Sequence, residues 1–321
     1  MKRIGLVLSG FIGLLFVIPI MFSVFNQIGP LDMTVESADK TTDSKPVDSS
    51  ETTNDSNALE TVTVFRVEDE TYDEIPLEEY IIGVVSGEMP ASYDEEALKA
   101  QAVAARSYTT KKIEAEGKMY DSVKHQVYLD EAQLKERWGD NYDKYHQKIT
   151  DAVLATAGEV IYYEDEVIEP LYFAMSNGKT ENAEDYWGSE IPYLRSVSSE
   201  WDTTSEKYEQ QVEFDVIKIC DIFKLDKISQ AKFEVLERTE GGNIAQILIG
   251  DRVYTGKEVR ELLQLRSTDF SVSVEADTVV ITTRGYGHEV GMSQYGANEL
   301  AKQGKTYDEI LNYYYQDIEV K

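Results

Sequence analysis

The chain has 321 residues, of which 42% are hydrophobic, enough to bury the core of one large domain or two smaller ones. Its 60 acidic residues outnumber its 31 basic residues and give a formal net charge of -29. An acidic surface repels phosphate backbones, so the composition argues against nucleic acid as a partner and leaves a neutral polymer, such as a sugar strand, compatible.

The N-terminus has the pattern of a membrane anchor. Lys2 and Arg3 precede an uncharged, apolar run at residues 4–25, which has the length of about 20 residues that a helix needs to cross a bilayer. No lysine or arginine follows before Lys40, so the positive-inside rule puts residues 1–3 in the cytoplasm and the rest outside. We interpret the run as an uncleaved single-pass anchor, because no small-x-small cleavage site follows it.

A polar segment separates the anchor from the part that should fold. Residues 26–59 contain many Ser, Thr, Asp and Asn residues and few apolar ones. This composition cannot bury a core, so we expect a flexible tether. Residues 60–321 then form an extracytoplasmic domain on the outer face of the cell membrane.

Hydrophobic periodicity predicts mixed helices and short strands in this domain. Ser92 with Glu95 and Thr306 with Glu309 have the spacing of capping boxes. Strands and helices do not alternate regularly, so we predict an α+β fold with short antiparallel strands that form a groove. The expected helices are 77–88, 97–112, 142–157, 257–265, 293–303 and 307–315, and the expected strands are 61–67, 160–163, 168–175, 244–249, 270–275 and 278–283.

The first candidate for chemistry is Glu88, at the junction between the first two helices. Its apolar neighbours Val84, Val85 and Met89 would raise the pKa of its carboxyl above the usual value of about 4.3. A carboxylic acid that stays protonated near neutral pH can donate a proton to a glycosidic oxygen. On these residues alone, a solvent-exposed glutamate at a helix end remains the alternative.

A second candidate is the alanine-rich helix at 97–112. Lys99 and Arg106 are seven positions apart and share one helix face, which could line a groove and bind sugar hydroxyls and carboxylates. The alternative is a buried alanine seam with ordinary surface charges.

The third candidate is the glycine-rich segment at 285–297. Its glycines let the backbone approach a ligand closely, and Tyr286 and Tyr295 offer flat faces for sugar rings. The context of a dinucleotide-binding or phosphate-binding loop is missing. The fourth candidate is a polar turn at 172–180 beside the aromatic residues at 185–188.

Together these segments resemble the stage II sporulation protein D family, the membrane-anchored lytic transglycosylases of endospore-forming bacteria. The resemblance covers about residues 60–320 and is strongest at 78–90, 97–106 and 287–297, in the family's order. The resemblance implies that Glu88 is the catalytic acid/base. We also count Tyr295 among the substrate-binding residues, because its ring offers a flat face to a sugar. The resemblance implies that the other substrate-binding residues are Lys99, Gln101, Arg106, Ser176, Thr180, His288, Ser293 and Gln294.

The implied reaction cleaves the bond between N-acetylmuramic acid and N-acetylglucosamine in peptidoglycan glycan strands. The muramic 6-hydroxyl attacks its own anomeric carbon and leaves a 1,6-anhydro end. One acid/base can serve both halves of this reaction, so no second carboxylate is needed to position a water. The family prefers strands stripped of peptide stems, and its implied partners during septum thinning and engulfment are stage II sporulation proteins P and M.

The sequence departs from the family in two places. Some members bind zinc through Cys and His, whereas the segment at 120–128 has His125 and no cysteine, so we expect no metal and no other cofactor. Glu289 stands where the family often has glycine, and Asn177 stands in a turn that is often Gly-Gly. A non-catalytic glycan-binding enhancer of a partner amidase, and an extracytoplasmic scaffold, remain alternatives to the enzyme.

Overall fold

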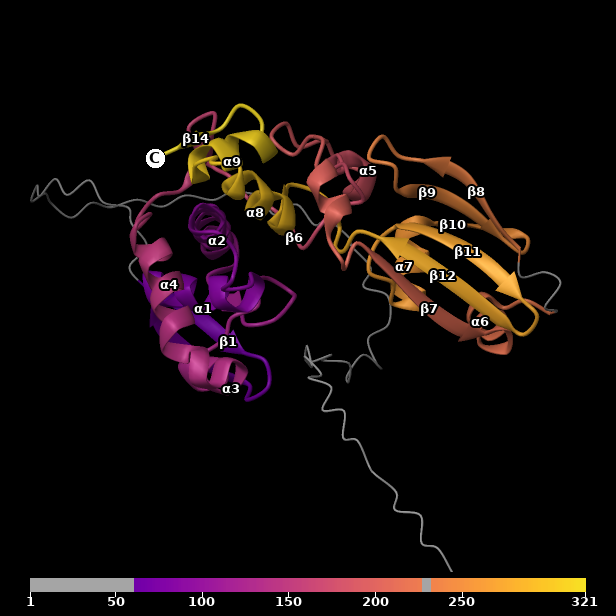
Figure 1. The fold of residues 1–321 in the computed structure, drawn as a ribbon, viewed down its shortest axis with the longest axis horizontal. Coiled ribbons are helices and arrows are strands. Elements are labelled where there is room, and N and C mark those ends of the chain that lie inside the picture. Colours follow the sequence, from indigo (N-terminus) through magenta and orange to yellow (C-terminus); the bar gives the residue numbers. More distant parts are fainter. Residues whose placement is uncertain (1–60, 227–231) are drawn as a thin grey trace, which may run out of the picture. The chain divides into compact units, whose positions relative to one another are not determined.

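The computed structural model describes residues 61–226 and 232–321 (Figure 1). The predicted stub at 1–3, anchor at 4–25 and tether at 26–59 lie outside these residues. Within the described ranges, no helix combines the length and apolarity that crossing a bilayer requires. The described chain consists of helices and short strands in irregular order, in agreement with the predicted mixture.

The N-terminal half begins with a hairpin and continues into helices. β1 pairs antiparallel with β2 and parallel with the two-residue β3. The parallel pairing departs from the expected antiparallel strands, and it forms because two helices carry the chain across between β1 and β3. The elements are β1 (Thr61–Arg66), β2 (Thr71–Pro76), α1 (Leu77–Glu88), α2 (Glu95–Glu116), β3 (Met119–Tyr120), α3 (Glu131–Trp138), a 3-10 turn (Gly139–Asn141) and α4 (Tyr142–Leu154).

The predicted range of α1 is confirmed, but the predicted cap of α2 is wrong. The Asp94 side chain, not that of Ser92, accepts a hydrogen bond from the first turn of α2, at the Glu96 N–H. Ser92 lies in a turn closed by the bond from the Tyr93 N–H to the Pro90 carbonyl, so it is too early in the chain to cap the helix.

The C-terminal half contains most of the strands. β4 pairs with β5 and β14, while β6 pairs in parallel with β13. The predicted strand at 168–175 is a strand only at β6. The elements are β4 (Ile161–Tyr163), β5 (Glu166–Val167), β6 (Tyr172–Phe173), α5 (Ala183–Trp187), a 3-10 turn (Glu200–Thr204), β7 (Glu209–Asp215), α6 (Val216–Phe223), β8 (Phe233–Arg238), β9 (Ile244–Ile249), β10 (Arg252–Thr255), α7 (Gly256–Leu263), β11 (Asp269–Glu275), β12 (Thr278–Arg284), β13 (Met292–Ser293), α8 (Gln294–Lys302), α9 (Tyr307–Tyr314) and β14 (Glu319–Val320).

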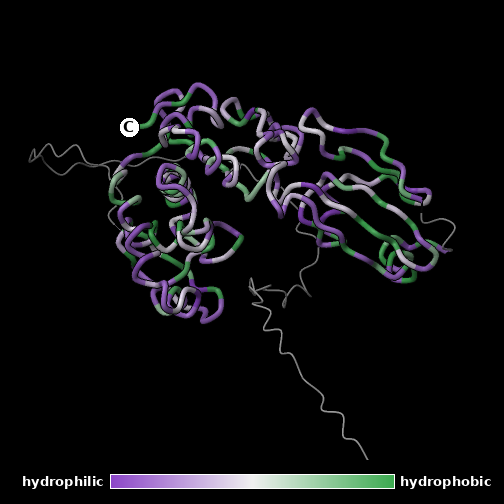
Figure 2. Tube along the Cα trace, viewed as in Figure 1, coloured by the Kyte–Doolittle hydropathy of each residue, from purple (hydrophilic) through white to green (hydrophobic). Residues whose placement is uncertain are grey.

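Two hydrophobic clusters stabilise this arrangement. One is built on α1, α2, α4, α8 and α9, and the other on α6, α7 and the sheets β11-β12-β7 and β10-β9-β8. Buried and half-buried residues alternate along β12, so this strand turns one face to the core of the second cluster, whose strands contain many hydrophobic residues (Figure 2).

The alanine-rich helix α2 is the centre of the first cluster. Helices α1, α4, α8 and α9 all contact it, and residues 97–109 contain only one position, Lys99, that is not buried. Alanine side chains let neighbouring helices approach closely, so the seam interpretation of this segment is the one that the structure supports.

Two glycines bring α1 against the extended segment at 126–129. A Cβ at Gly83 would lie 2.3 Å from Cε2 of Tyr128 and 2.8 Å from the carbonyl oxygen of Leu129. A Cβ at Gly87 would lie 2.5 Å from the carbonyl oxygen of Val127. Atoms do not approach this closely without displacement, so both positions need glycine for the segment to lie against the helix.

We expect Gly83→Ala to lower the free energy of unfolding by about 1–3 kcal/mol, because the added methyl displaces Tyr128 and Leu129. The helix preference of alanine, about 1 kcal/mol, offsets only part of this loss. Denaturant unfolding of the full-length chain in detergent, followed by tryptophan fluorescence, measures the change. Glu79→Ala, at an exposed position of the same helix, is the control and should stay within about 0.5 kcal/mol. Equal stability of the two variants would contradict the close packing.

Candidate functional site

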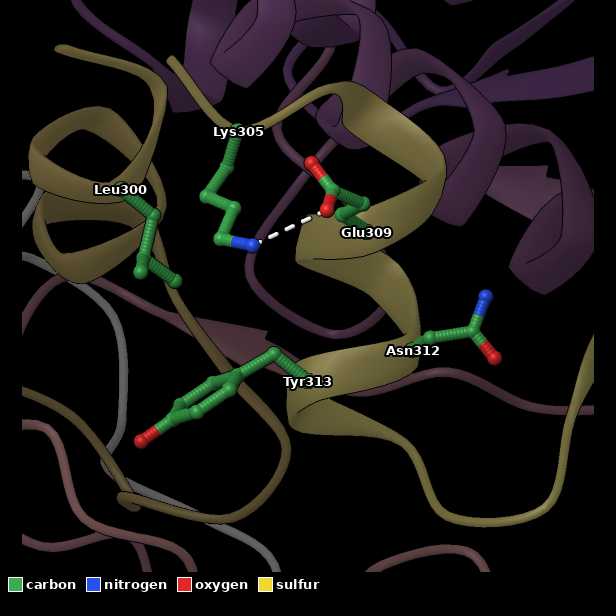
Figure 3. A pocket seen from close by; sticks show the side chains of 5 residues that line it. All are labelled: Leu300, Lys305, Glu309, Asn312 and Tyr313. Carbon is green, nitrogen blue, oxygen red and sulfur yellow. Dashed lines mark hydrogen bonds and ion pairs between the residues drawn. The ribbon is translucent and has the colours of Figure 1, made fainter. Parts of the chain in front are cut away.

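Two surface recesses of the described chain contain none of the predicted site residues. One recess of about 310 Å³ lies between α8 and α9, where Lys305 pairs with Glu309 at 2.9 Å (Figure 3). Another, of about 360 Å³, is formed by β10 and α7. Neither is lined by a residue that the sequence predicts to act on substrate, so we describe the site outward from Glu88.

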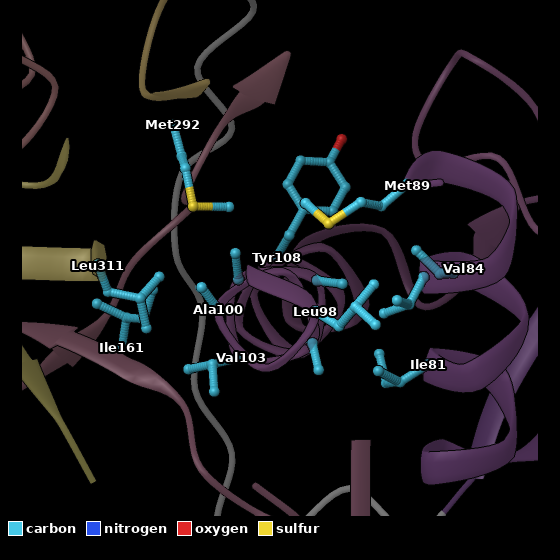
Figure 4. Packing of buried hydrophobic residues seen from close by; sticks show 14 of the residues in the cluster. Ile81, Val84, Met89, Leu98, Ala100, Val103, Tyr108, Ile161, Met292 and Leu311 are labelled. Atoms are coloured by element: carbon cyan, nitrogen blue, oxygen red, sulfur yellow. The ribbon is translucent and has the colours of Figure 1, made fainter. Parts of the chain in front are cut away.

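Glu88 is the last residue of α1, and the packing of α1 on α2 fixes its position. Ile81 and Val84 point toward Leu98 of α2, and Met89 folds over the same cluster (Figure 4). Met292, next to the predicted binding residue Ser293, reaches the opposite side of α2. Helix α2 therefore lies between the segment that ends in Glu88 and the glycine-rich segment at 285–297.

The carboxyl of Glu88 is half-buried and has one hydrogen bond from the protein. The Val127 N–H donates to its Oε1 at 2.7 Å, and its Oε2 makes no hydrogen bond within the described part of the chain. Burial raises the pKa of Glu88 to about 7, against the opposing effects of the Val127 bond and the positive charge of Arg137. A carboxyl with this pKa is substantially protonated at neutral pH, as a proton donor to a sugar oxygen must be.

Arg137, from α3, holds the end of α1 on which Glu88 lies. Its Nη1 donates to the carbonyl oxygens of Ser86 at 3.1 Å and Gly87 at 3.2 Å. The last carbonyls of a helix lack partners within it, so these bonds fix the last turn. The sequence analysis did not identify Arg137, because no local pattern links it to a residue that is so distant along the chain.

A buried polar chain lies beside the same carboxyl. The Tyr172 hydroxyl donates to Oε1 of Gln126 at 2.8 Å, and Nε2 of Gln126 donates to the Thr109 hydroxyl at 2.9 Å. The pKa of Tyr172 is raised well above its ordinary value, by burial first and then by the charge of Glu88. Gln126 directly precedes Val127, so this chain of bonds fixes the segment that donates to Glu88.

Contacts between strands and glutamines bring the remaining motifs together. The parallel pairing of β6 with β13 sets Met292 beside Tyr172 and Ser293 beside Phe173. Nε2 of Gln294 donates to Oε1 of Gln101 at 3.2 Å, which joins the glycine-rich segment to α2. The four sequence segments that support the resemblance therefore meet around α2 and β6.

Two predicted binding residues share a partner that the sequence analysis missed. The hydroxyls of Ser176 and Ser293 donate to the two oxygens of buried Asp202, at 2.6 and 2.9 Å. Burial raises the pKa of Asp202, while these hydrogen bonds favour its ionised form. Asp202 lies in a 3-10 turn with no recognisable motif, so only the fold reveals it. With both hydroxyls engaged inside the protein, their contact with substrate stays a prediction.

Three further predicted residues have partners within the protein. Arg106 is buried and donates from Nε and Nη2 to Glu78 at 2.9 and 2.6 Å. Lys99 pairs with glutamates in the first turn of its own helix, each at 2.8 Å. The buried hydroxyl of Thr180 accepts from the Val197 N–H at 2.8 Å. Within the described ranges, no hydrogen bond or ion pair joins any of the three to Glu88, and their binding role stays a prediction.

His288 lies among aromatic rings. Its ring centroid is 5.7 Å from that of Phe173, 6.0 Å from that of Tyr186 and 5.4 Å from that of Trp187. Burial lowers the pKa of His288 to about 3, so it is neutral, and its Nδ1 accepts from the Val290 N–H at 3.1 Å. Trp187 is 43% exposed, so part of this cluster faces solvent.

Tyr295, predicted as a ring face for sugars, is half-buried on α8. Its ring meets that of Tyr93 edge-on, with centroids 6.5 Å apart. Its N–H donates to the Ala174 carbonyl at 3.0 Å, which ties the start of α8 to the end of β6.

Glu289 and Asn177, which stand where the family often has glycine, contact one another. The Glu289 carboxylate accepts from the Asn177 N–H at 3.4 Å and from Nδ2 of Asn243 at 3.1 Å, and Asn243 also donates to Glu181 at 3.0 Å. Burial raises the pKa of Glu289 and of Glu181. The larger side chain that replaces glycine is thus turned inward, into a polar network that ties the two segments together.

His125 contacts Tyr120 and Glu116 rather than a set of ligands. Its Nδ1 accepts from the Tyr120 N–H at 3.3 Å, and its Nε2 is 3.3 Å from Glu116. Across residues 61–226 and 232–321, no group of three or more His, Cys, Asp or Glu side chains is placed to hold a metal ion.

Comparison with known proteins places this geometry in a family. The family model described as Stage II sporulation protein (SpoIID) matches residues 67–163, which include Glu88, Val127 and Arg137. The chain is 40% identical over 331 residues to stage II sporulation protein D of Bacillus subtilis (strain 168), which covers 100% of this chain and 96% of that protein. It is 42% identical over 268 residues to stage II sporulation protein D of Bacillus amyloliquefaciens, with 81% and 78% covered.

A more distant relative carries a different name. The amidase enhancer of Bacillus subtilis (strain 168) is 28% identical over 288 residues, which is 73% of this chain and 39% of that protein. The identity and coverage of the first two relatives decide the assignment: the chain belongs to the stage II sporulation protein D family and has a role in sporulation.

Proposed function

We propose that the chain is a lytic transglycosylase of peptidoglycan, with Glu88 as its acid/base. The observation that carries the proposal is a half-buried carboxyl with a pKa near 7 and one hydrogen bond to Oε1, whose Oε2 has no partner among residues 61–226 and 232–321. The buried carboxylates Asp202 and Glu289 accept hydrogen bonds inside the protein and are closed off from solvent, so substrate does not reach them. Glu88 is therefore the carboxyl best placed to exchange a proton with substrate.

The reaction needs only this one group. Protonated Glu88 donates to the glycosidic oxygen while the bond from the muramic anomeric carbon to N-acetylglucosamine breaks. The muramic 6-hydroxyl then forms a bond to the same carbon and gives its proton to the Glu88 carboxylate. The proton is regenerated and no water is consumed, so a second carboxylate is not required, as it would be in an inverting hydrolase.

Aromatic faces suit the substrate. Trp187 and Tyr286 are exposed, and Tyr295 is partly so. Such rings pack against sugars with little loss of conformational entropy. We include them with the predicted binding residues as the walls of the groove, at which strands stripped of peptide stems would bind. We also propose that the anchor at 4–25 holds the domain outside the cell membrane, with stage II sporulation proteins P and M as partners in septum thinning and engulfment.

Replacing Glu88 by Gln should lower the turnover of stem-free glycan strands by about 10²- to 10⁴-fold, the usual contribution of a general acid. Mass spectrometry of the products, counting 1,6-anhydro ends, measures the rate. Glu79→Gln, which changes an exposed glutamate of the same helix, is the control and should cleave like the unchanged chain. The unchanged chain releasing no 1,6-anhydro ends would refute the proposal.

The pH dependence of cleavage should report the raised pKa of Glu88. A general acid works only while protonated, so we expect kcat on stem-free strands to fall as pH rises through about 7. Initial rates between pH 4 and pH 9 check this. A fall centred near the ordinary value of 4.5 would show that the carboxyl is not held in the environment described above.

The relative named amidase enhancer supports a second candidate, a non-catalytic activator of a partner amidase. In that case Glu88→Gln would stimulate a sporulation amidase on intact peptidoglycan as well as the unchanged chain does, and neither would release 1,6-anhydro ends alone. We expect instead that cleavage is lost in this variant whether or not stimulation is kept. Assaying peptide release and anhydro ends in the same reactions separates the two functions.

A further inference from the structure

Arg137 offers an unused cationic group beside Glu88. Its side chain is exposed, and among the described residues its hydrogen bonds are those from Nη1 to the carbonyls of Ser86 and Gly87. No ion pair within the described ranges links it to a carboxylate, whereas Arg66 and Arg106 are both paired with acidic residues. Nε and Nη2 therefore remain available as two donors of a planar fork.

The lack of a partner is notable because acidic residues are abundant. The chain carries 60 of them against 31 basic residues, and Arg66, Arg195 and Arg238 each form ion pairs with acidic side chains. In the reactive state Glu88 is protonated and neutral, so it does not neutralise the guanidinium. The Arg137 guanidinium is thus a positive charge on a molecule with a strongly negative net charge. Such a group can bind a small anionic group on an otherwise neutral polymer.

This inference rests on the proposed function, which sets a muramic acid residue beside Glu88. That sugar carries a lactyl group on its 3-oxygen. The lactyl group ends in a carboxylate when the peptide stem has been removed and in a neutral amide when the stem is present. An arginine fork matches a carboxylate with two parallel hydrogen bonds, and charge-assisted bonds are roughly twice as strong as neutral ones.

We propose that Arg137 is a specificity-determining residue that binds the free lactyl carboxylate of stem-stripped muramic acid. Its Nη1 bonds fix the guanidinium at the end of α1, so the fork is held in place before substrate arrives. The same positive charge offsets the repulsion that a substrate carboxylate would exert on an ionised Glu88 after the first half of the reaction.

The test compares two substrates that differ in one group. Stem-free strands are used as prepared, or after their lactyl carboxylates have been converted to methylamides. For the full-length chain in detergent, Arg137→Gln should lower kcat/KM on the carboxylate strands by about 10- to 100-fold, the effect of losing a hydrogen bond to a charged group. Its rate on the methylamide strands should change less than about threefold. Arg252→Gln, at an exposed arginine of β10, is the matched control and should leave both rates unchanged.

Two outcomes would overturn the proposal: equal losses on both substrates, which assign Arg137 to the support of α1 alone, or no loss on either. If Arg137→Gln does not fold, Arg137→Lys keeps the charge without the fork and should still reduce the preference for carboxylate strands at least threefold. Binding of both strands is measured in parallel by co-sedimentation. If the unchanged chain cleaves neither substrate but binds carboxylate strands selectively, and Arg137→Gln loses this selectivity, the proposed role of Arg137 stands and the proposed enzymatic activity is refuted.

Discussion

The candidate site depends on the contact between α1 and the extended segment at 126–129. Gly83 and Gly87 leave no side chain between them, and so the Val127 N–H reaches Glu88 at 2.7 Å. The helix end is then covered by backbone rather than by water, which raises the pKa of the carboxyl. If the segment lay a side chain farther away, Glu88 would be an ordinary exposed glutamate at a helix end.

Local signals explain why parts of this arrangement could be predicted. Hydrophobic periodicity predicted the bounds of α1, and Thr306 with Glu309 forms the expected capping box of α9. The segment that contains Lys99 and Arg106 is helical, as predicted. A position on a helix does not reveal the partner of a side chain, so the pairing of Arg106 with Glu78 in the core could not be predicted. The cap of α2 was missed because Asp94 and Ser92 have similar capping propensities and only the turn after Pro90 distinguishes them.

The groups that sequence reasoning could not find act through contacts between distant segments. Asp202 joins Ser176 to Ser293, and Arg137 supports α1 from α3. Neither residue lies in a recognisable motif, and neither belongs to a hydrophobic or charge pattern that would indicate its role. The family motifs identified the segments that meet. The residues that hold these segments together depend on the tertiary structure, and local patterns in a single sequence do not indicate them.

Burial of carboxyls at and around the site has a cost in stability that depends on pH. The pKa values of Glu88, Asp202, Glu181 and Glu289 are all raised by burial, so the folded chain holds protons that the unfolded chain releases. For Glu88 the window runs from about 4.5 to about 7, and within it the free energy of unfolding decreases as pH rises. Hydrogen bonds to Asp202 and Glu289 limit this cost by favouring their ionised forms, and at Glu88 the Val127 bond and the charge of Arg137 act in the same direction. Asp202 and Glu289 are closed off from solvent, and Oε1 of Glu289 is buried without a hydrogen bond from the described residues, whereas Glu88 is partly exposed. A raised pKa together with access to solvent is what separates Glu88 from the carboxyls that only support the fold.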